Sequence, residues 1–545
     1  MTSPEPTQKY PGRLRWIWRT ILFVSIVGLS LLIVTTVQNA RVIRQLEENG
    51  IIVSTEEGTL LRALPLDWQY WLDDTLGEEN FLGLMTAVEL DCRYQSLSED
   101  DFIAISQFKH LTYIDFFSAS IEEGRLKHIT GLQSLKALTL TGATITDSDL
   151  KYVGKLKNLH YLYLSDTAIS DAGLAHLQGL SELRVLELHN TPIDGTGLVH
   201  LKGILHLEEL DLGNYQFNYV VGNDGEYENE FRPQIRDASL KYIGELKHLK
   251  TLSLSGAEIS DAGLAHLQDL KKLETLEFER ENITDKGVSH LKGLVNLTRL
   301  RLEDSHVSDA GLMHLAKLRK LESLYLNRTS ISDMGLIHLQ RLTSLQSLDL
   351  SDTKVTDDGL LQLNQLQNLE SLKLSGTNVS GIGLSSLKKL SMLQYLVMDY
   401  SKLNDHGLIA VAELQSLDSL VLSGTQITDQ GLVHLSDLTN LKKLDLQETS
   451  ISDAGLVHLS HLTGLKELNL IGTRITDAGL VHLSGMTNLE ELGLNKTAVS
   501  DAGLIHLQKL TSLTNLGIKE SKITPAGFTR LQESLPRVTE AFKIW

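Results

Sequence analysis

Cysteine is nearly absent from this chain, and proline is scarce. Cys92 is the single cysteine among 545 residues, so no intrachain disulfide can form. It lies where a first strand is expected, and no motif supports a catalytic or lipid-bearing role, so we expect a buried thiol. Eight prolines and a charged fraction of 22% argue against extended disorder.

Basic residues are fewer than acidic ones, with 50 Lys or Arg against 69 Asp or Glu. The formal net charge is −19. Residues 1–44 hold six Lys or Arg and one Glu, which sum to +5, so the rest of the chain carries −24. A strongly acidic surface repels phosphate backbones, and we therefore expect no nucleic-acid partner.

Motifs for catalysis are missing as well. The chain has no G-x-S-x-G elbow, no phosphate loop of the G-x-x-x-x-G-K type and no H-E-x-x-H pair. We therefore expect no enzyme activity, no cofactor and no small-molecule substrate.

The chain does have a repeat of 24 residues. Asp453-Ala454-Gly455-Leu456, Asp477-Ala478-Gly479-Leu480 and Asp501-Ala502-Gly503-Leu504 are three consecutive copies. The anchor position, usually Asp, falls at 99, 123, 147, 171 and 195, then at 237 and every 24 residues to 525. A fixed period of this length predicts a solenoid, in which each unit buries its apolar face against the next.

Each period has two halves. Leucines spaced by three, from Leu456 to Leu465, favour a short helix or 3₁₀ segment, and the alternation over 468–470 favours a short strand. Thr476 or Asp477 is expected to accept hydrogen bonds at the next helix start. Gly455 allows a close backbone approach or a positive φ, and Thr473 is expected to bond loop backbone between stacked coils.

Histidine recurs five residues after the anchor, for example at His458, His482 and His506. No Cys or paired carboxylate accompanies it at a ligand spacing, and the anchors supply only one carboxylate per coil. We therefore expect no metal and a half-exposed side chain on the helix side. A pH response or a rare metal site remains an open alternative for this row of histidines.

The pattern L-x-x-L-x-L-x-x-T-x-I-T/S-D-x-G-L, from Leu465 to Leu480, resembles the leucine-rich repeat family, with Thr where many members have Asn or Cys. The resemblance covers roughly residues 93–540 and is greatest to bacterial, often membrane-anchored, proteins with Thr-Asp-x-Gly-Leu repeats. It implies an α/β solenoid: a horseshoe of about 18 repeats with a parallel β-sheet on its concave face and helices on its convex face.

The amino terminus is the one long apolar run. Residues 20–37 are uncharged and, with Ile17 and Trp18, long enough to span a bilayer as a signal-anchor helix. More positive charge precedes than follows it, which places 1–19 in the cytoplasm and the repeats outside, in the periplasm or at the cell surface. A cleaved signal peptide is the alternative. Residues 38–92 are then expected to form a linker and an amino-terminal cap. Residues 93–545 are expected to form the solenoid, and its carboxyl-terminal cap is expected to begin at about 525.

Binding is expected at side chains that vary between the strand leucines, because these face the concave side. Tyr and Arg are typical anchors of protein interfaces. An aromatic and acidic group and a mixed-charge group stand out: Tyr113, Asp115, Tyr161, Tyr163, Glu187 and Asp211, and Arg299, Arg301 and Tyr325.

One interval breaks the repeat, because 42 residues separate anchors 195 and 237. The excess lies in 213–233 and predicts a long loop beside the concave face, with a β-hairpin turning near 223–225. Long loops on rigid scaffolds often carry function, although a tolerated insertion is the alternative. The loop is unusually aromatic, with Tyr215, Phe217, Tyr219, Tyr227 and Phe231.

These features predict a membrane-anchored recognition module that binds a protein or peptide through the concave face and the 213–233 loop. Two other hypotheses fit the same repeats: a structural or adhesion spacer of the cell envelope, and a substrate-selecting adaptor for a separate enzyme. The sequence does not name the partner.

Overall fold

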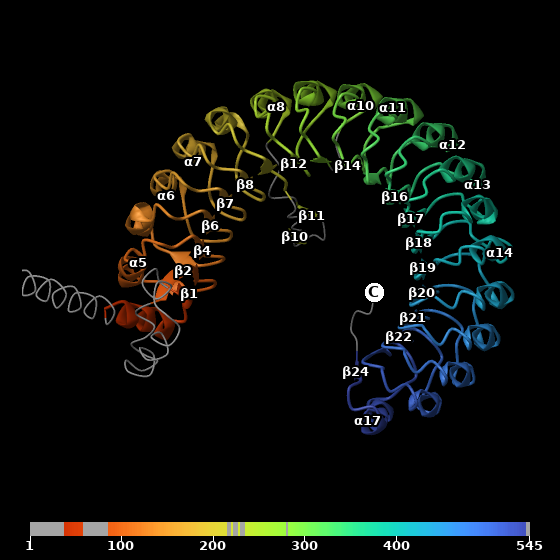
Figure 1. Ribbon diagram of the computed structural model, residues 1–545. Coiled ribbons are helices and arrows are strands. Elements are labelled where there is room, and N and C mark those ends of the chain that lie inside the picture. The colour runs from red at the N-terminus through yellow and green to blue at the C-terminus, as the bar shows by residue number, and fades with distance from the viewer. Residues whose placement is uncertain are drawn as a thin grey trace, which may run out of the picture. The chain divides into compact units, whose positions relative to one another are not determined.

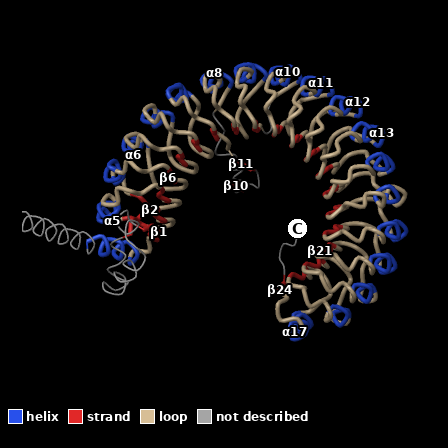
Figure 2. Tube along the Cα trace, viewed as in Figure 1, coloured by secondary structure: helices blue, strands red, loops and turns tan. Residues whose placement is uncertain are grey.

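The computed structural model describes residues 38–57, 85–214, 220–221, 227–228, 235–278 and 282–540. These residues form two compact units. Unit 1 takes the described residues up to Ile193 together with Val199–Leu207, and unit 2 takes Asp194–Leu198 and the described residues from Glu208 onward. Within each unit the strands lie on the inner side of a curve and the helices on its outer side (Figures 1 and 2). This is the arrangement of coils that the repeat predicts.

The sheet of unit 1 is parallel apart from its first pair. Strand β1 (Ile52–Glu57) runs antiparallel to β2 (Met85–Asp91). From β2 onward each strand pairs in parallel with the strand of the next coil: β4 (Tyr113–Asp115), β6 (Ala137–Thr139), β7 (Tyr161–Tyr163) and β8 (Val185–Glu187). A separate short parallel pair joins β3 (Ser96–Leu97) to β5 (Ser120–Ile121).

Short helices form the other side of unit 1. A helix over 38–48 buries Ala40, Ile43 and Leu46 in front of the first coil. The coil helices are α5 (Glu99–Ile105), η2 (Arg125–Gly131), α6 (Asp147–Val153), α7 (Asp171–Leu174) and η3 (Ala175–Leu177). The 3₁₀ helix η4 (Thr196–Gly203) contains residues of both units.

The main sheet of unit 2 is parallel throughout its described strands, with one three-residue strand in nearly every coil. In chain order these strands are β9 (Glu209–Asp211), β12 (Thr251–Ser253), β13 (Thr275–Glu277), β14 (Arg299–Arg301), β15 (Ser323–Tyr325), β16 (Ser347–Asp349), β17 (Ser371–Lys373), β18 (Tyr395–Val397), β19 (Ser419–Val421), β20 (Lys443–Asp445), β21 (Glu467–Asn469), β22 (Glu491–Gly493), β23 (Asn515–Gly517) and β24 (Thr539–Glu540).

The helices of unit 2 are one or two turns long until the last coil. They are α8 (Asp237–Ile243), α9 (Asp261–Leu264), η5 (Ala265–Leu267), α10 (Asp285–Leu291), α11 (Asp309–Leu315), α12 (Asp333–Leu336), η6 (Ile337–Leu339), α13 (Asp357–Leu360), η7 (Leu361–Leu363), η8 (Ile382–Leu387), α14 (Leu408–Val411), α15 (Asp429–Leu432), η9 (Val433–Leu435), α16 (Asp453–Leu456), η10 (Val457–Leu459), η11 (Gly479–Leu483), η12 (Gly503–Leu507) and α17 (Pro525–Ser534).

The leucines of both halves of the repeat form the core. Leu456, Leu459, Leu465 and Leu468 are completely buried. Because each strand pairs with the strand 24 residues later, equivalent leucines stack in columns, as Leu468 does with Leu492. Cys92 is buried too, as expected, and burial raises the pKa of its thiol.

The anchor aspartates bind the following coil rather than their own helix. Asp453 Oδ1 accepts a hydrogen bond of 2.8 Å from the backbone N–H of Thr476, and Asp453 Oδ2 accepts one of 2.6 Å from its hydroxyl. The same pair of bonds recurs from Asp147 with Ser170 to Asp501 with Thr524. In coils such as those of α9 and α15, the Ser or Thr before the anchor caps the helix, and Thr476 likewise accepts from the backbone N–H of Ala478 at 3.3 Å. Of the two caps expected, the threonine is therefore confirmed, and the aspartate is wrong because its carboxylate reaches a neighbour 23 residues away.

Two other repeat positions also have defined contacts. A Cβ atom on Gly479 would lie 2.4 Å from Asp453 Oδ1, and Gly479 is not among the glycines with positive φ, so the glycine provides close approach. Thr473 donates to the carbonyl of Leu470 at 2.5 Å, three residues back in its own coil. The expected threonine contact between stacked coils is therefore wrong.

The last coil ends in a longer helix, α17, which begins where the repeat breaks at Pro525. In α17, Pro525 occupies the first turn and Thr524 caps the helix. The helix buries its own Phe528 and Leu531, and Val538 is buried just before β24. Strand β24 extends the sheet in parallel.

No helix in the described ranges is long and apolar enough to cross a membrane. The apolar segment 20–37 lies outside those ranges, as do residues 58–84 of the expected linker and amino-terminal cap.

An ion-pair cluster joins the coil of α5 to the coil of η2 and predicts a pH dependence. Lys127 Nζ and His128 Nε2 lie 2.8 and 3.1 Å from Glu99 Oε1, and Arg125 donates to Oε2. These hydrogen bonds, that of Lys127 foremost, lower the pKa of Glu99 from 4.5 to about 2. A depressed carboxyl pKa stabilises the fold above the unfolded-state pKa, and this contribution disappears as the pH falls through the folded-state value.

Glu99→Gln is therefore expected to lower the melting temperature at pH 7. The difference from the natural protein should narrow as the pH falls from about 4.5 toward 2. Thermal melts followed by circular dichroism at several pH values measure this difference. A difference that stays constant over that range would contradict the assignment of the effect to the Glu99 charge.

Candidate functional site

The exposed side of each sheet is the surface where binding is expected, and we call it the strand face. In β4, Ile114 is completely buried while Tyr113 and Asp115 are half-buried on the opposite side. The same alternation holds in β7, where Leu162 is buried between Tyr161 and Tyr163. The period of two along a strand therefore puts the first and third residue of each strand on the strand face.

The strand face of unit 1 holds an open groove of about 660 Å³, which we call the unit 1 groove. It brings together four of the predicted site residues, which are Tyr113, Tyr161, Tyr163 and Glu187. Its other lining residues are Phe117, Ala137, Thr139, Thr141, Asp166 and His189. Asp115 lies beside it in β4.

The sheet register sets the order of side chains along the groove. One row across the strands is Tyr113, Ala137 and Tyr161, and the next is Asp115, Thr139, Tyr163 and Glu187. Strands in a sheet lie about 4.8 Å apart, so the backbones of Tyr113 and Tyr161 are about 10 Å apart, with the small Ala137 between them. The small side chain of Ala137 thus leaves space in the groove between the two tyrosines.

Hydrogen bonds and ring contacts hold the β4 end of the groove. The Tyr113 hydroxyl donates to Asp115 Oδ2 at 3.1 Å and lies 3.4 Å from Thr139 Oγ1. Asp115 Oδ1 accepts from the backbone N–H of Phe117 at 2.9 Å, and the Phe117 ring meets Tyr94 edge-on at 5.4 Å. Burial raises the pKa of Tyr113, so its phenol is neutral at physiological pH.

The β8 end adds residues that sequence reasoning did not select. His189 Nδ1 lies 2.8 Å from Ser165 Oγ, and His189 Nε2 lies 3.8 Å from Asp166 Oδ2. Asp166 also accepts from Asn190 Nδ2 at 2.9 Å. Asp166 and His189 lie in the turns two or three residues after β7 and β8, and polar residues at those turn positions were the sequence signal that could have indicated them.

The mixed-charge group predicted in unit 2 is a compact cluster on its own strand face. Arg299 donates from Nε to Glu277 at 2.8 Å and from a terminal nitrogen to the Tyr325 hydroxyl at 3.1 Å. Arg301 pairs with Glu303, which the sequence did not single out. The two guanidinium carbons lie 4.8 and 5.8 Å from the centre of the Tyr325 ring. The structure thus brings Arg299, Arg301 and Tyr325 together.

Asp211 stands at the start of the predicted loop, in unit 2. Its Oδ1 accepts from the backbone N–H of Gly213 at 2.9 Å, and Asn214 continues the sheet ladder with a bond of 2.7 Å to Ser255. The regular coil therefore continues through Asn214, which is two residues into the expected loop of 213–233.

Part of the predicted hairpin is described. Strand β10 (Val220–Val221) pairs antiparallel with β11 (Tyr227–Glu228), which confirms a hairpin around the expected turn. Figure 1 places both on the side of unit 2 that carries its strands. Tyr215, Phe217, Tyr219 and Phe231 lie outside the described residues, and so does the side chain of Tyr227.

Some side chains between the strand leucines are covered rather than open to a partner. Asp445 and Asn469 are buried, and Asn469 Nδ2 donates to Asp445 Oδ2 at 3.1 Å. Asp445 also accepts from the Ser423 hydroxyl at 2.9 Å. Short polar side chains in this part of unit 2 therefore bond one another and nearby backbone.

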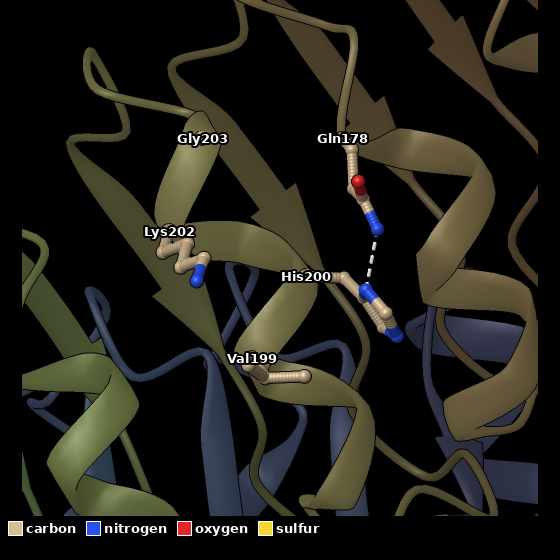
Figure 3. Close-up of a pocket in the computed structure, with 5 residues that line it drawn as sticks. All are labelled: Gln178, Val199, His200, Lys202 and Gly203. Atoms are coloured by element: carbon tan, nitrogen blue, oxygen red, sulfur yellow. Dashed lines mark hydrogen bonds between the residues drawn. The ribbon is translucent and has the colours of Figure 1, made fainter.

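A second cavity, of about 370 Å³, lies among helical residues of unit 1 (Figure 3). Gln178, Val199, His200, Lys202 and Gly203 line it, and Gln178 hydrogen-bonds His200, one of the repeated histidines. Across the described ranges no three His, Cys, Asp or Glu side chains gather where they could hold a metal ion. Here the repeated histidine serves as a hydrogen-bond partner between coils.

Comparisons with known proteins agree with this architecture. A family model described as leucine-rich repeat matches residues 155–177, 245–267, 341–363, 365–388, 413–436 and 437–460. No curated protein matches the chain.

Several solved structures are similar. An internalin from Listeria monocytogenes is 30% identical, with a TM-score of 0.46, over 56% of this chain and 83% of that chain. A leucine-rich repeat protein of Leptospira interrogans is 19% identical, with a TM-score of 0.43, over 82% of this chain and 93% of that chain. The Arabidopsis receptor kinase HAESA, solved with a peptide hormone and a co-receptor, is 16% identical, with a TM-score of 0.50, over 92% of this chain and 81% of that chain.

The six matched segments have the phase of the 24-residue period and fall on coils made of one strand and one short helix. The chain belongs to the leucine-rich repeat family.

Proposed function

We propose that this protein is a recognition module that binds a protein or peptide through its strand face. The observation that carries the proposal is the unit 1 groove, where three tyrosines and a phenylalanine line an open surface of about 660 Å³. Tyrosine is enriched at the centres of protein interfaces because it offers a large apolar area with a polar end. The groove lies on a parallel sheet whose short strands are tied coil to coil, so its residues are held in place before binding.

The proposal includes a membrane anchor formed by residues 20–37. The excess of Lys and Arg on the amino side of that run supports a cytoplasmic amino terminus, with the repeats on the outer side of the membrane. The 213–233 loop is proposed as a second contact region, because the segment that follows strand β9 in the chain forms the hairpin of β10 and β11 and its aromatic content suits an interface.

The test is crosslinking on spheroplasts with a reagent that does not cross membranes, followed by purification of the protein and mass spectrometry. We expect a specific crosslinked partner with the natural chain and loss of that partner with Tyr161→Leu. Replacing 215–233 by a short Gly-Ser linker should also lose it, while Gly213 and Asn214 keep their places in the ladder. Melting curves of both variants should stay close to that of the natural chain, because neither change removes core residues.

The matched control is Tyr395→Leu. Tyr395 occupies the first position of β18 and is 45% exposed, against 39% for Tyr161 in the first position of β7. An unchanged partner in the Tyr161 and linker variants would contradict recognition and favour a structural or adhesion role. Crosslinks that form only after the membrane is opened would contradict the proposed orientation.

A further inference from the structure

The helices of unit 2 carry a row of exposed aliphatic side chains. One such side chain lies four residues after the anchor in five consecutive coils, and we call these five residues the unit 2 helix row: Ile409, Val433, Val457, Val481 and Ile505. Each is between 43% and 63% exposed. The helices that carry them contact one another from coil to coil on the outer side of the unit (Figures 1 and 2). The five side chains therefore form one extended apolar surface rather than isolated spots.

The fold does not require an aliphatic residue at this position of the repeat. In other coils the same position is basic or a serine, as in Lys127, Lys151, Lys241, Ser289 and Ser385. The helices of those coils form all the same. Because the position accepts lysine elsewhere, five aliphatic residues in succession indicate a surface that a partner covers. Ser385 belongs to the coil before the first member of the row and so ends it on that side.

The surroundings of the row carry little charge, although the chain as a whole is acidic. In the helical segments 453–460, 477–484 and 501–508 no residue is Lys, Arg or Glu. Their acidic residues are the three anchors, whose carboxylates bond the next coil. Three residues before the row these segments expose small apolar side chains, namely Ala454, Ala478 and Ala502. A neutral surface of this kind offers a charged partner no electrostatic complementarity.

We propose that the unit 2 helix row is a contact surface for a second copy of this chain, which packs the same row against it about a two-fold axis beside Val457. In a two-fold contact, a residue on the axis meets its own copy. Charged residues would meet like charge there, whereas an aliphatic row meets itself without repulsion. Val457 is the middle member of the row, so an axis beside it pairs the two halves of the row with each other. The row lies on the helix side of unit 2, so this contact is independent of recognition through the strand face.

The size of the row indicates a weak dimer. At these exposed fractions the five side chains present roughly 400 Å² of apolar surface, against the ~800 Å² that each partner buries in a standard interface. The exposed alanines add to this area, while the curve of unit 2 keeps the outermost coils of two such rows apart. We therefore expect a dimer that exchanges readily, and a covalent crosslink is the suitable first measurement.

The first experiment introduces a thiol into the row. Cys92 is the one natural cysteine and is buried, so Val457→Cys gives the chain a single exposed thiol. Membranes that contain the full-length variant are oxidised with copper phenanthroline, and covalent dimers are measured on non-reducing gels. We expect a disulfide between two copies, because the axis brings the two thiols together. Leu361→Cys is the matched control, since Leu361 has the same place in its coil, is 55% exposed and lies outside the row; it should crosslink at least about threefold less.

The second experiment tests the two-fold packing with charge. Val457→Glu and Val457→Lys should each lower energy transfer between donor-tagged and acceptor-tagged copies in the same vesicles at least about threefold, because each places like charges across the axis. Mixing donor-tagged Val457→Glu with acceptor-tagged Val457→Lys should restore the transfer, since opposite charges then face each other. Leu361→Glu should leave it unchanged. Melting curves of all these variants should stay near that of the natural chain, because the substituted side chains are exposed.

Two results would overturn the proposal. Equal crosslinking of Val457→Cys and Leu361→Cys would show chance collision within the membrane. No recovery of energy transfer in the mixed sample would show that the row faces something other than its own copy, such as a lipid surface or a different protein. The outcome is separable from that of the proposed function, because Tyr161→Leu, which is expected to lose the crosslinked partner, should leave both dimer measurements unchanged.

Discussion

Replacing Leu470 by Ala is expected to lower the free energy of unfolding by about 2–5 kcal/mol, the usual cost of a buried leucine truncated to alanine. Leu470 follows strand β21 and is completely buried. Its N–H bonds Gly493 of the next coil, so the backbone there is held on both sides and cannot collapse into the space left by the side chain. Urea unfolding followed by circular dichroism measures the change.

Leu361→Ala is the matched control, because it makes the same chemical change at a side chain that is 55% exposed in the same unit. We expect its effect to stay within about 0.5 kcal/mol. A Leu470→Ala protein as stable as the Leu361→Ala protein would contradict the assignment of the strand leucines to the core.

Replacing Gly479 by Ala is expected to destabilise the protein by about 1–3 kcal/mol through overpacking, although alanine favours helices more than glycine does. An added Cβ would lie 2.4 Å from Asp453 Oδ1 and 3.1 Å from the Leu456 side chain. The carboxylate cannot withdraw without weakening its two bonds to Thr476, which join one coil to the next. The clash therefore acts on the link between coils.

The control for this prediction is Gly485→Ala, where an added Cβ meets nothing within 4 Å. It should be neutral or stabilise by up to about 1 kcal/mol, since it restricts the unfolded chain. A double-mutant cycle with Asp453→Ala isolates the contact, and the cost of Gly479→Ala should fall once the carboxylate is gone. Additive effects would show that Gly479 and Asp453 act independently and would contradict the proposed role of the glycine.

Local patterns predicted each coil well. The three-residue spacing of leucines gave the helical half, and the alternation around Asn469 gave the strand, because both depend on neighbours within one coil. The break in the period between anchors 195 and 237 located the hairpin of β10 and β11 for the same reason. The buried state of Cys92 also followed from its place in the first coil.

Contacts between coils were predicted less well. A helix-start aspartate usually caps its own helix, and nothing within one period says that Asp453 instead bonds Thr476. The loop boundary at Asn214 was missed in the same way, since it depends on a ladder bond to Ser255. The unit 1 groove depends most on contacts between coils. The register of successive strands is what brings together Tyr113, Tyr161 and His189.

The period, the strand and helix of each coil, the leucine core and the interruptions of the repeat could all be predicted, because they follow from side-chain spacing along a few turns of chain. Which variable side chains are exposed on the strand face could be found only from the packing of neighbouring coils. Tyr163 in the third position of β7 is half-buried, whereas Asn469 in the third position of β21 is completely covered. Exposure on the strand face depends on the size and hydrogen bonding of side chains one coil away, a distance of about 4.8 Å in space but 24 residues in sequence.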